Sequence, residues 1–151
     1  MTTAIANRCL WFLDTLVEVR HEPSPTAEYS LIDATARPGN TVPLHSHDED
    51  EVITVLEGQL TLTVDGASTV LGPGESVVAP RDIPHRYQVT SGGDARWLVL
   101  TTPGRFGEFV VELSRPADTP SLPPVGEPPT AAQLEHLAST AALHGITILP
   151  S

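Results

Sequence analysis

Cysteine is almost absent from this chain of 151 residues, and basic side chains are few. The single cysteine, Cys9, cannot form a disulfide within the chain, and an isolated thiol is typical of a reducing compartment, so a cytoplasmic location is expected. Eight basic against nineteen acidic residues give a formal net charge of -11, so neither nucleic acid nor an anionic membrane is a predicted partner. No apolar run is long enough to cross a bilayer, and residues 1–8 do not look like a signal peptide.

The chain is instead built of short apolar segments separated by glycine and proline, which predicts an all-β fold in a single domain. The predicted strands cover residues 10–20, 29–36, 52–56, 59–64, 76–79, 86–90 and 95–101. Asp65-Gly66 predicts a hairpin, because a type I′ turn needs positive φ at both residues. Periodicity alone allows either a jelly-roll barrel or an immunoglobulin-like sandwich.

The last third of the chain changes character. Apolar residues spaced i, i+3, i+4 and i+7 predict a short amphipathic helix at 105–114, namely Phe106, Phe109, Val110 and Leu113. Six prolines between residues 116 and 130 then predict an extended linker.

A second helix is expected after the linker. Thr130-x-x-Gln133 predicts a capping box, Gly145 a helix end, and residues 146–149 a final strand. The apolar stripe expected on this helix is formed by Leu134, Leu137, Ala138 and Ala141. We therefore divide the chain into a β-barrel with its helix at 1–116, and a linker with a C-terminal helix packing on the barrel at 117–151.

Two histidines and a glutamate lie at a spacing that suits one metal ion. The pattern is Gly39-x5-His45-x-His47-x3-Glu51-x6-Gly58, and a fourth candidate ligand, His85, follows in Gly74-x5-Pro80-x-Asp82-x2-His85. Residues two apart on a strand face the same side, so His45 and His47 point together, and Glu51 has the same parity. Imidazole and carboxylate without thiolate predict one divalent transition metal per chain, with Fe, Ni, Mn, Co, Cu and Zn all open. The acidic residues between the ligands, Asp48, Glu49 and Asp50, are expected in a solvated loop; the alternatives are that one binds the metal, or that Glu49 or Asp50 orients a ligand histidine.

This double pattern resembles the cupin superfamily. The first motif agrees with the first cupin signature at every fixed position, and the second agrees at Gly74, Pro80 and His85. It departs at Asp82, where glycine is usual, and at Val89, where asparagine is usual. The resemblance covers roughly residues 8–116 and implies a jelly-roll barrel with His45, His47, Glu51 and His85 as metal ligands. It also implies a homodimer that exchanges an N-terminal strand, for which residues 10–19 are the candidate.

Strand parity indicates which side chains line the pocket. Ile53 shares the parity of Glu51, and Tyr87 that of His85, so Tyr87 is expected as the aromatic residue nearest the metal. Phe106 and Phe109 are expected to close the open end of the barrel over a hydrophobic substrate. The alternatives are that Tyr87 belongs to the core, and that the two phenylalanines pack on the outer face of the sheet. We name Ile53, Tyr87, Phe106 and Phe109 as candidate substrate-binding residues.

Three functions are compatible with these residues. The chain is similar to small cupins of the quercetin dioxygenase type, which implies a metal-dependent dioxygenase acting on an aromatic or phenolic substrate and dioxygen, with Glu51 as the catalytic base. The first alternative is a non-redox polyketide cyclase or isomerase that uses the metal as a Lewis acid. The second is a non-catalytic small-molecule-binding protein. A DNA-binding regulator is not predicted, since no helix-turn-helix segment or basic patch accompanies the barrel.

Overall fold

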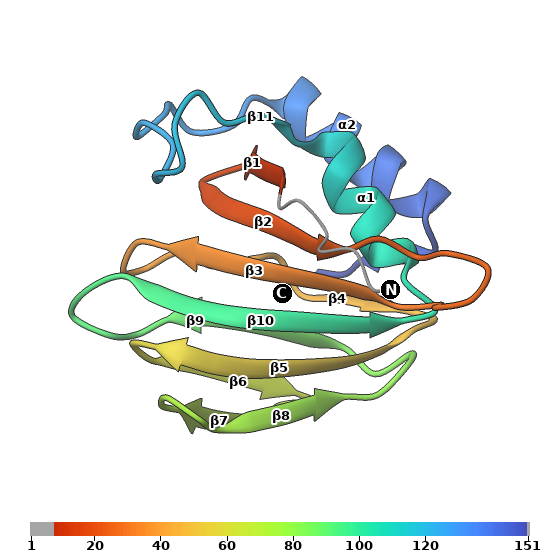
Figure 1. The fold of residues 1–151 in the computed structure, drawn as a ribbon, viewed down its shortest axis with the longest axis horizontal. Helices are drawn as coiled ribbons and strands as arrows, with labels where there is room; N and C mark the ends of the chain where they lie inside the picture. Colours follow the sequence, from red (N-terminus) through yellow and green to blue (C-terminus); the bar gives the residue numbers. More distant parts are fainter. Residues whose placement is uncertain (1–7, 151) are drawn as a thin grey trace, which may run out of the picture.

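The computed structural model of the protein describes residues 8–150, which fold into two facing β-sheets. The larger sheet has the order β11 (Arg115–Pro116), β1 (Arg8–Phe12), β2 (Thr15–His21), β3 (Ser30–Ala36), β10 (Ala95–Thr102), β5 (Asp50–Glu57) and β8 (Ser76–Ala79). The smaller sheet has the order β12 (Ile146–Ile148), β4 (His45–His47), β9 (His85–Val89), β6 (Leu60–Val64) and β7 (Ala67–Leu71), and lies behind the larger one in Figure 1. The predicted all-β jelly roll is confirmed, in the form of two facing sheets.

The core lies between the sheets and follows from the two-residue period of the strands. Along β5 and β10, buried and less buried residues alternate, so Ile53, Val55, Trp97 and Val99 point inward. The Trp97 side chain is only 1% exposed, and removing a buried ring of this size costs roughly 3–5 kcal/mol. This packing holds β5, which carries Glu51, in a fixed position.

The first strand differs from the prediction. A single strand over residues 10–20 is wrong, because the chain turns at Leu13, with φ 52°, and separates β1 from β2. The two strands pair in register, with Phe12 opposite Thr15. In this chain β1 pairs with β2 on one side and β11 on the other, so the segment proposed for exchange has partners within the chain. The homodimer itself stays a prediction.

Several turns adopt the expected backbone. Asp65 and Gly66 have φ values of 51° and 78°, which confirms the positive-φ hairpin between β6 and β7. Asp82, at the position where cupins usually have glycine, has φ 66°, a value that glycine adopts at lower cost. Its backbone N–H donates to the carbonyl oxygen of His47 at 2.7 Å, so this turn packs directly on the strand that carries two candidate ligands.

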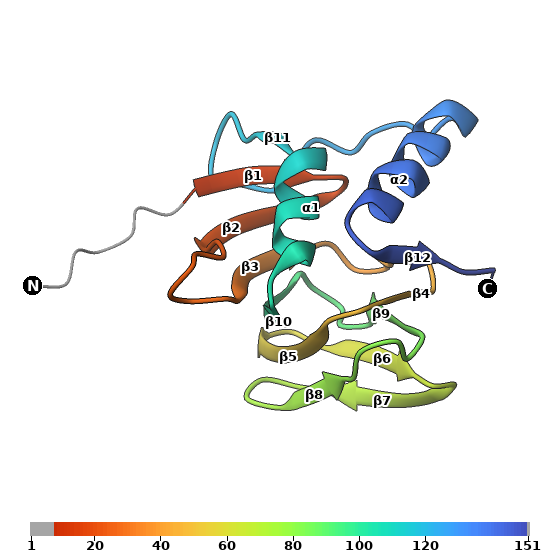
Figure 2. The ribbon, with the colours of Figure 1, turned by 90° about the vertical axis from the view of Figure 1, so that its right-hand side faces the viewer.

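Two helices cover one side of the sheets. α1 (Arg105–Leu113) forms where an amphipathic helix is predicted, and it contacts β1, β3 and β10. It approaches β3 closely because Gly107 has no side chain; a Cβ atom there would overlap Ser30. In Figure 2, α1 lies across the ends of the strands of the larger sheet.

The second helix, α2 (Ala131–Leu143), begins with the predicted capping box of Thr130 and Gln133. The predicted apolar stripe is only partly used: Ala141 is buried, but Leu134 is 49% exposed. β12 follows α2 and pairs with β4, so the end of the chain lies beside the strand of the candidate ligands (Figure 2). No helix or strand forms between residues 117 and 130.

Two predictions concern residues that the structure does not describe. The absence of a signal peptide was predicted for residues 1–8, of which 1–7 lie outside the described residues. The outer limits of the two-part division, residues 1 and 151, also lie outside them. The division near residue 116 and the cytoplasmic location both stay predictions. Within residues 8–150, neither helix has the length and apolarity that a membrane crossing would need.

Candidate metal centre and cavity

Three strands bring the four candidate ligands together. His45 and His47 come from β4, Glu51 from the start of β5, and His85 from β9, where it pairs with His45. One potential ligand atom from each residue lies within 4.8 Å of those from the other three. The Nε2 atoms of His47 and His85 lie 2.8 and 3.1 Å from Oε2 of Glu51. Four side chains that are up to 40 residues apart in the sequence thus converge on one point.

The histidine rings are oriented by the backbone. Each Nδ1 lies near a carbonyl oxygen, at 2.8 Å for His45, 3.0 Å for His47 and 2.9 Å for His85. A carbonyl oxygen can only accept, so each Nδ1 carries a hydrogen and donates it. In the neutral rings the Nε2 lone pairs are therefore left to point at one another and at Glu51.

The charges of the cluster are set by burial and by proximity. Burial lowers the pKa of His45 to about 4, with a further contribution from His85, so His45 is neutral at pH 7. Burial alone would raise the pKa of Glu51, but when His47 and His85 carry a hydrogen on Nε2, their hydrogen bonds and positive charges outweigh this effect and hold the pKa well below its usual range. Burial opposes the charged form of His47, yet the adjacent Glu51 carboxylate raises its pKa. The site thus contains a buried carboxylate that attracts positive charge.

This donor set fits a transition metal. Three nitrogen lone pairs and one carboxylate oxygen meet in a buried place, and no thiolate is present among them. Such lone pairs repel one another unless a proton or a cation lies between them. Imidazole and carboxylate together suit the metals from Mn to Zn, and the Nδ1 hydrogen bonds supply the outer support that metal-binding histidines commonly have.

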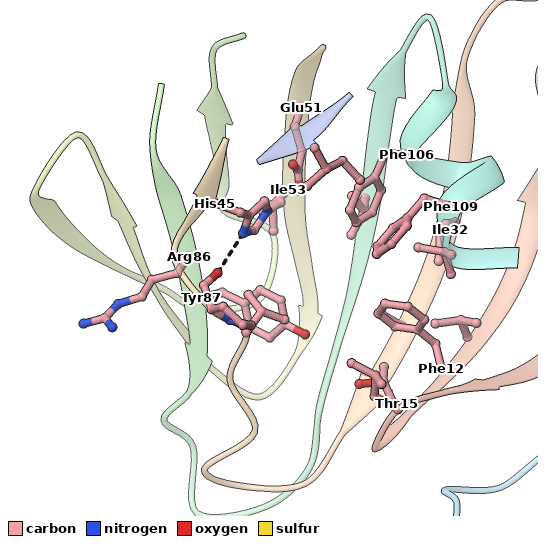
Figure 3. A pocket seen from close by; sticks show the side chains of 18 of the residues that line it. Phe12, Thr15, Ile32, His45, Glu51, Ile53, Arg86, Tyr87, Phe106 and Phe109 are labelled. Carbon is pink, nitrogen blue, oxygen red and sulfur yellow. Dashed lines mark hydrogen bonds between the residues drawn. The ribbon is translucent and has the colours of Figure 1, made fainter. Parts of the chain in front are cut away.

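A cavity opens beside the cluster and is mostly apolar. Figure 3 shows His45 and Glu51 at one end, and Phe12 and Thr15 at the other. All four residues named as substrate-binding candidates line it: Ile53, Tyr87, Phe106 and Phe109. Their position is therefore inside, and the alternative that the two phenylalanines pack on the outer sheet face is wrong. Whether they bind substrate stays a prediction.

The aromatic residue packed on a candidate ligand, His47, is Phe106 rather than Tyr87. The Phe106 ring lies 5.7 Å from the His47 ring, whereas Tyr87 packs on Trp97 at 5.0 Å. The Tyr87 hydroxyl donates to Asn40 Oδ1 at 3.2 Å, and burial raises its pKa, so it is a neutral hydrogen-bonding group. Parity placed Tyr87 on the correct face but did not show how far along the barrel it lies.

Comparison with known proteins agrees with this geometry. The sequence profile of the cupin domain matches residues 33–101, the segment that contains all four candidate ligands. The chain belongs to the cupin superfamily. Within it, the chain is similar to quercetin 2,3-dioxygenase of Bacillus subtilis (strain 168), at 32% identity over 74% of this chain and 32% of that protein.

Two further proteins are also similar to the chain, one in sequence and one in fold. The HTH-type transcriptional regulator PuuR of Escherichia coli (strain K12) is 34% identical over 57% of this chain and 47% of its own length. The polyketide cyclase RemF from Streptomyces resistomycificus has a similar fold, with a TM-score of 0.58, 24% identity, and coverage of 68% of this chain and 80% of that one. The chain spans about half the length of the regulator and about a third of the dioxygenase.

Several residues of the cupin cavity were not predicted from the sequence. Leu137 of α2 and Ile146 and Ile148 of β12 line it, although they follow the proline-rich segment. The apolar spacing of α2 was visible, but nothing local indicated where that helix would pack. Phe12 and Thr15 escape prediction for a different reason, because the sequence pattern predicts one continuous strand where the chain turns at Leu13.

Glu49 departs from its main expectation, although the sequence already offered it as a residue that orients a ligand histidine. Its expected place in a solvated loop is wrong, because the residue is 1% exposed and its carboxylate accepts hydrogen bonds from the backbone N–H groups at the start of α1. The donors are Gly104, Arg105 at 2.9 Å and Phe106 at 2.6 Å. Its backbone carbonyl also accepts the Nδ1 hydrogen of His47. Glu49 therefore joins the ligand strand to the helix that carries Phe106. A shared parity with His47 and Glu51 was the available signal.

The two neighbours of Glu49 behave differently. Asp48 forms an ion pair with Arg105 at 2.9 Å, and Asp50 forms one with Arg81 at 3.2 Å. Both pairs are largely exposed, so the solvated loop is confirmed for Asp48, whereas Asp50 is solvated but begins β5. Each is engaged away from the four candidate ligands.

Proposed function

We propose that this cupin binds one divalent transition metal through His45, His47, Glu51 and His85 and acts as a dioxygenase on a small aromatic or phenolic substrate. The observation that carries the proposal is the convergence of three Nε2 atoms and one buried carboxylate at the wall of an apolar cavity. The similarity to quercetin 2,3-dioxygenase supports the reaction class. The substrate is inferred to be apolar because the cavity lining offers few polar groups besides the cluster.

The residues of the site would have three roles: binding the metal, accepting a proton and excluding water. A bound divalent metal would act as a Lewis acid and favour the deprotonated form of a phenolic hydroxyl. Glu51 is ionised, because its pKa is held low, so one carboxylate oxygen can accept that proton. Ile53 and Phe106 exclude water beside it, which strengthens the electrostatic interactions of the carboxylate.

The metal is the first part to test. Elemental analysis of protein purified without a polyhistidine tag or chelator should give about one equivalent of a transition metal per chain. His47→Ala and His85→Ala should each lose most of it and remain folded by circular dichroism. His136→Ala, which removes an exposed imidazole outside the cluster, is the matched control and should retain the metal. Wild-type metal content in both ligand variants would refute the assigned site.

The reaction is tested with an oxygen electrode and the metal-loaded protein. Oxygen uptake that depends on a phenol supports the oxygenase. Glu51 acts as base if uptake falls at least about a hundredfold in Glu51→Gln that has been reloaded with excess metal to the wild-type content, since Glu51 is also a candidate ligand. A redox-inert metal or the absence of oxygen uptake, together with cyclised or isomerised product, would instead indicate Lewis-acid chemistry on the same ligands.

The similarity to a transcriptional regulator favours a second candidate, a cupin that binds a small molecule without turnover. The regulator is 34% identical to this chain over 87 residues, slightly above the identity of the dioxygenase. If the protein only binds, we expect saturable binding of a small molecule, and that molecule should be recovered unchanged after prolonged incubation in air. Product formation at catalytic rates would exclude it.

A further inference from the structure

The space beside the candidate ligands is too small for a substrate with several rings. This inner cavity has a volume of about 80 Å³. Sites for drug-sized ligands have roughly 300–1,000 Å³, and an engineered cavity that holds benzene has roughly 150 Å³. At about half the volume that holds benzene, the inner cavity can enclose only the hydroxyl-bearing edge of a phenol, and the rest of the molecule needs another place.

A larger space lies directly beside it. This outer groove, with a volume of about 710 Å³, is bounded by the β1–β2 turn, residues 40–43 and the start of α2. Phe12, Thr15, Tyr87 and Leu137 are among the residues that line both spaces, so a single layer of side chains separates them. In Figure 3, Phe12 and Thr15 lie at the end of the inner cavity away from Glu51. A molecule that passes this layer would reach the candidate ligands with one end and leave the other in the groove.

The groove offers more polar partners than the cavity. Hydrogen-bonding side chains line it on two sides, Thr41 from the loop before β4 and Gln133 and His136 from α2. Leu134, which is 49% exposed, supplies an apolar surface from α2. This combination suits a ring that carries hydroxyl groups, because the ring can pack on the leucine and the hydroxyls can exchange hydrogen bonds with the amide and imidazole.

The charges of the groove disfavour an anionic ligand. Two carboxylates, Asp14 and Glu127, line it against one guanidinium, Arg115. That guanidinium lies 5.0 Å from the centre of the Trp11 ring, where the aromatic face already stabilises it. The whole chain adds to this bias with its net charge of -11.

We propose that the outer groove is a second subsite that binds the distal end of an elongated, uncharged polycyclic phenol, while its reacting hydroxyl end passes between Tyr87 and Leu137 into the inner cavity. This inference rests on the proposed function, because it takes the inner cavity as the place of reaction. Tyr87 and Leu137 then select for length and planarity, and α2, which follows the proline-rich segment, contributes directly to substrate choice.

The test compares two tryptophan substitutions on α2. Ala132 lines the groove and Ala142 does not, both are exposed, and both lie within the helix. Binding is measured anaerobically by calorimetry on the metal-loaded protein, with quercetin as a three-ring probe and catechol as a one-ring probe. With its hydroxyls at the candidate ligands, catechol would extend only into the layer of Phe12 and Thr15 that the two spaces share. Ala132→Trp should weaken quercetin binding at least about tenfold and leave catechol binding unchanged, whereas Ala142→Trp should alter neither. Equal quercetin affinity in the two variants would overturn the subsite, as would an equal loss of catechol binding in Ala132→Trp.

Oxygen uptake separates this inference from the function on which it rests. Uptake with catechol, combined with quercetin affinity that is the same in both variants, would retain the oxygenase and reject the groove. The predicted difference in quercetin affinity without uptake with either phenol would retain the groove as a binding site and reject the oxygenase.

Discussion

Replacing Glu49 by glutamine should destabilise the fold without emptying the metal site. The Glu49 carboxylate accepts three backbone N–H groups at the start of α1, and the local cap residue of that helix, Gly104, supplies no side-chain acceptor. In glutamine, one carboxylate oxygen becomes an NH2 group, which faces N–H donors and leaves at least one of them unsatisfied. An unsatisfied buried donor costs about 1–3 kcal/mol, and a negative charge at a buried helix N-terminus contributes up to about 2 kcal/mol. We therefore expect the free energy of unfolding to fall by about 2–4 kcal/mol.

The assay is unfolding by guanidinium chloride and by heat. For a chain of this length the loss corresponds to a decrease in Tm of about 5–15 °C. Glu108→Gln is the matched control, since it removes an exposed acid from the first turn of the same helix and should cost about 0.5 kcal/mol or less. The metal content should stay at the wild-type level, because His47 is held by the backbone carbonyl of residue 49, which the substitution keeps. Equal stability of the two variants would refute the role assigned to Glu49.

Three further predictions concern stability. Asp82→Gly should raise the free energy of unfolding by about 0.5–1 kcal/mol, because Asp82 has φ 66°; a lower denaturant midpoint would contradict this. Asp33→Asn should lower stability by about 2 kcal/mol at pH 7, because the buried carboxylate accepts from Arg96 at 2.6 Å and from Arg20 at 2.8 Å. Burial opposes ionisation of Asp33, but these arginines lower its pKa. The ionised Asp33 therefore stabilises the fold fully above its ordinary pKa of about 4, and this stabilisation is lost as the pH falls below that value. Denaturation curves of the wild type and Asp33→Asn should converge in acid. Removing the metal by dialysis against a chelator should lower the Tm of the wild type by several degrees but leave Glu51→Gln nearly unchanged, and an equal decrease in both would show that Glu51 is not a ligand.

Much of the candidate site could be predicted from the sequence, because the direction of a side chain on a strand depends only on its near neighbours in the chain. His45 and His47 lie two residues apart on one strand, so their shared direction follows from strand geometry. The same rule correctly placed Glu51 and Ile53 on the inner face of β5, and the turn at Asp65 was predictable from its need for positive φ. The turn at Leu13 was not, because leucine rarely adopts φ 52° and carries no turn signal.

The parts that escaped prediction depend on contacts between distant segments. Glu49 reads as one more acidic residue until α1, more than fifty positions later, places its N–H groups over it. The apolar face of α2 could be seen, but only packing decided that Leu137 would line the cavity while Leu134 stayed largely exposed.

The sequence by itself predicted an all-β fold, because strand periodicity and turn chemistry act over a few residues. The jelly roll and the four candidate ligands were predictable from the resemblance of its two motifs to those of cupins. The tertiary structure decided the shape of the space in front of those ligands. β12 lies beside β4 and α2 lies at the mouth of the cavity, and neither position has a local signal. Such pairings are selected by the apolar area that they bury and the backbone hydrogen bonds that they complete, and both depend on segments that meet only when the chain has folded.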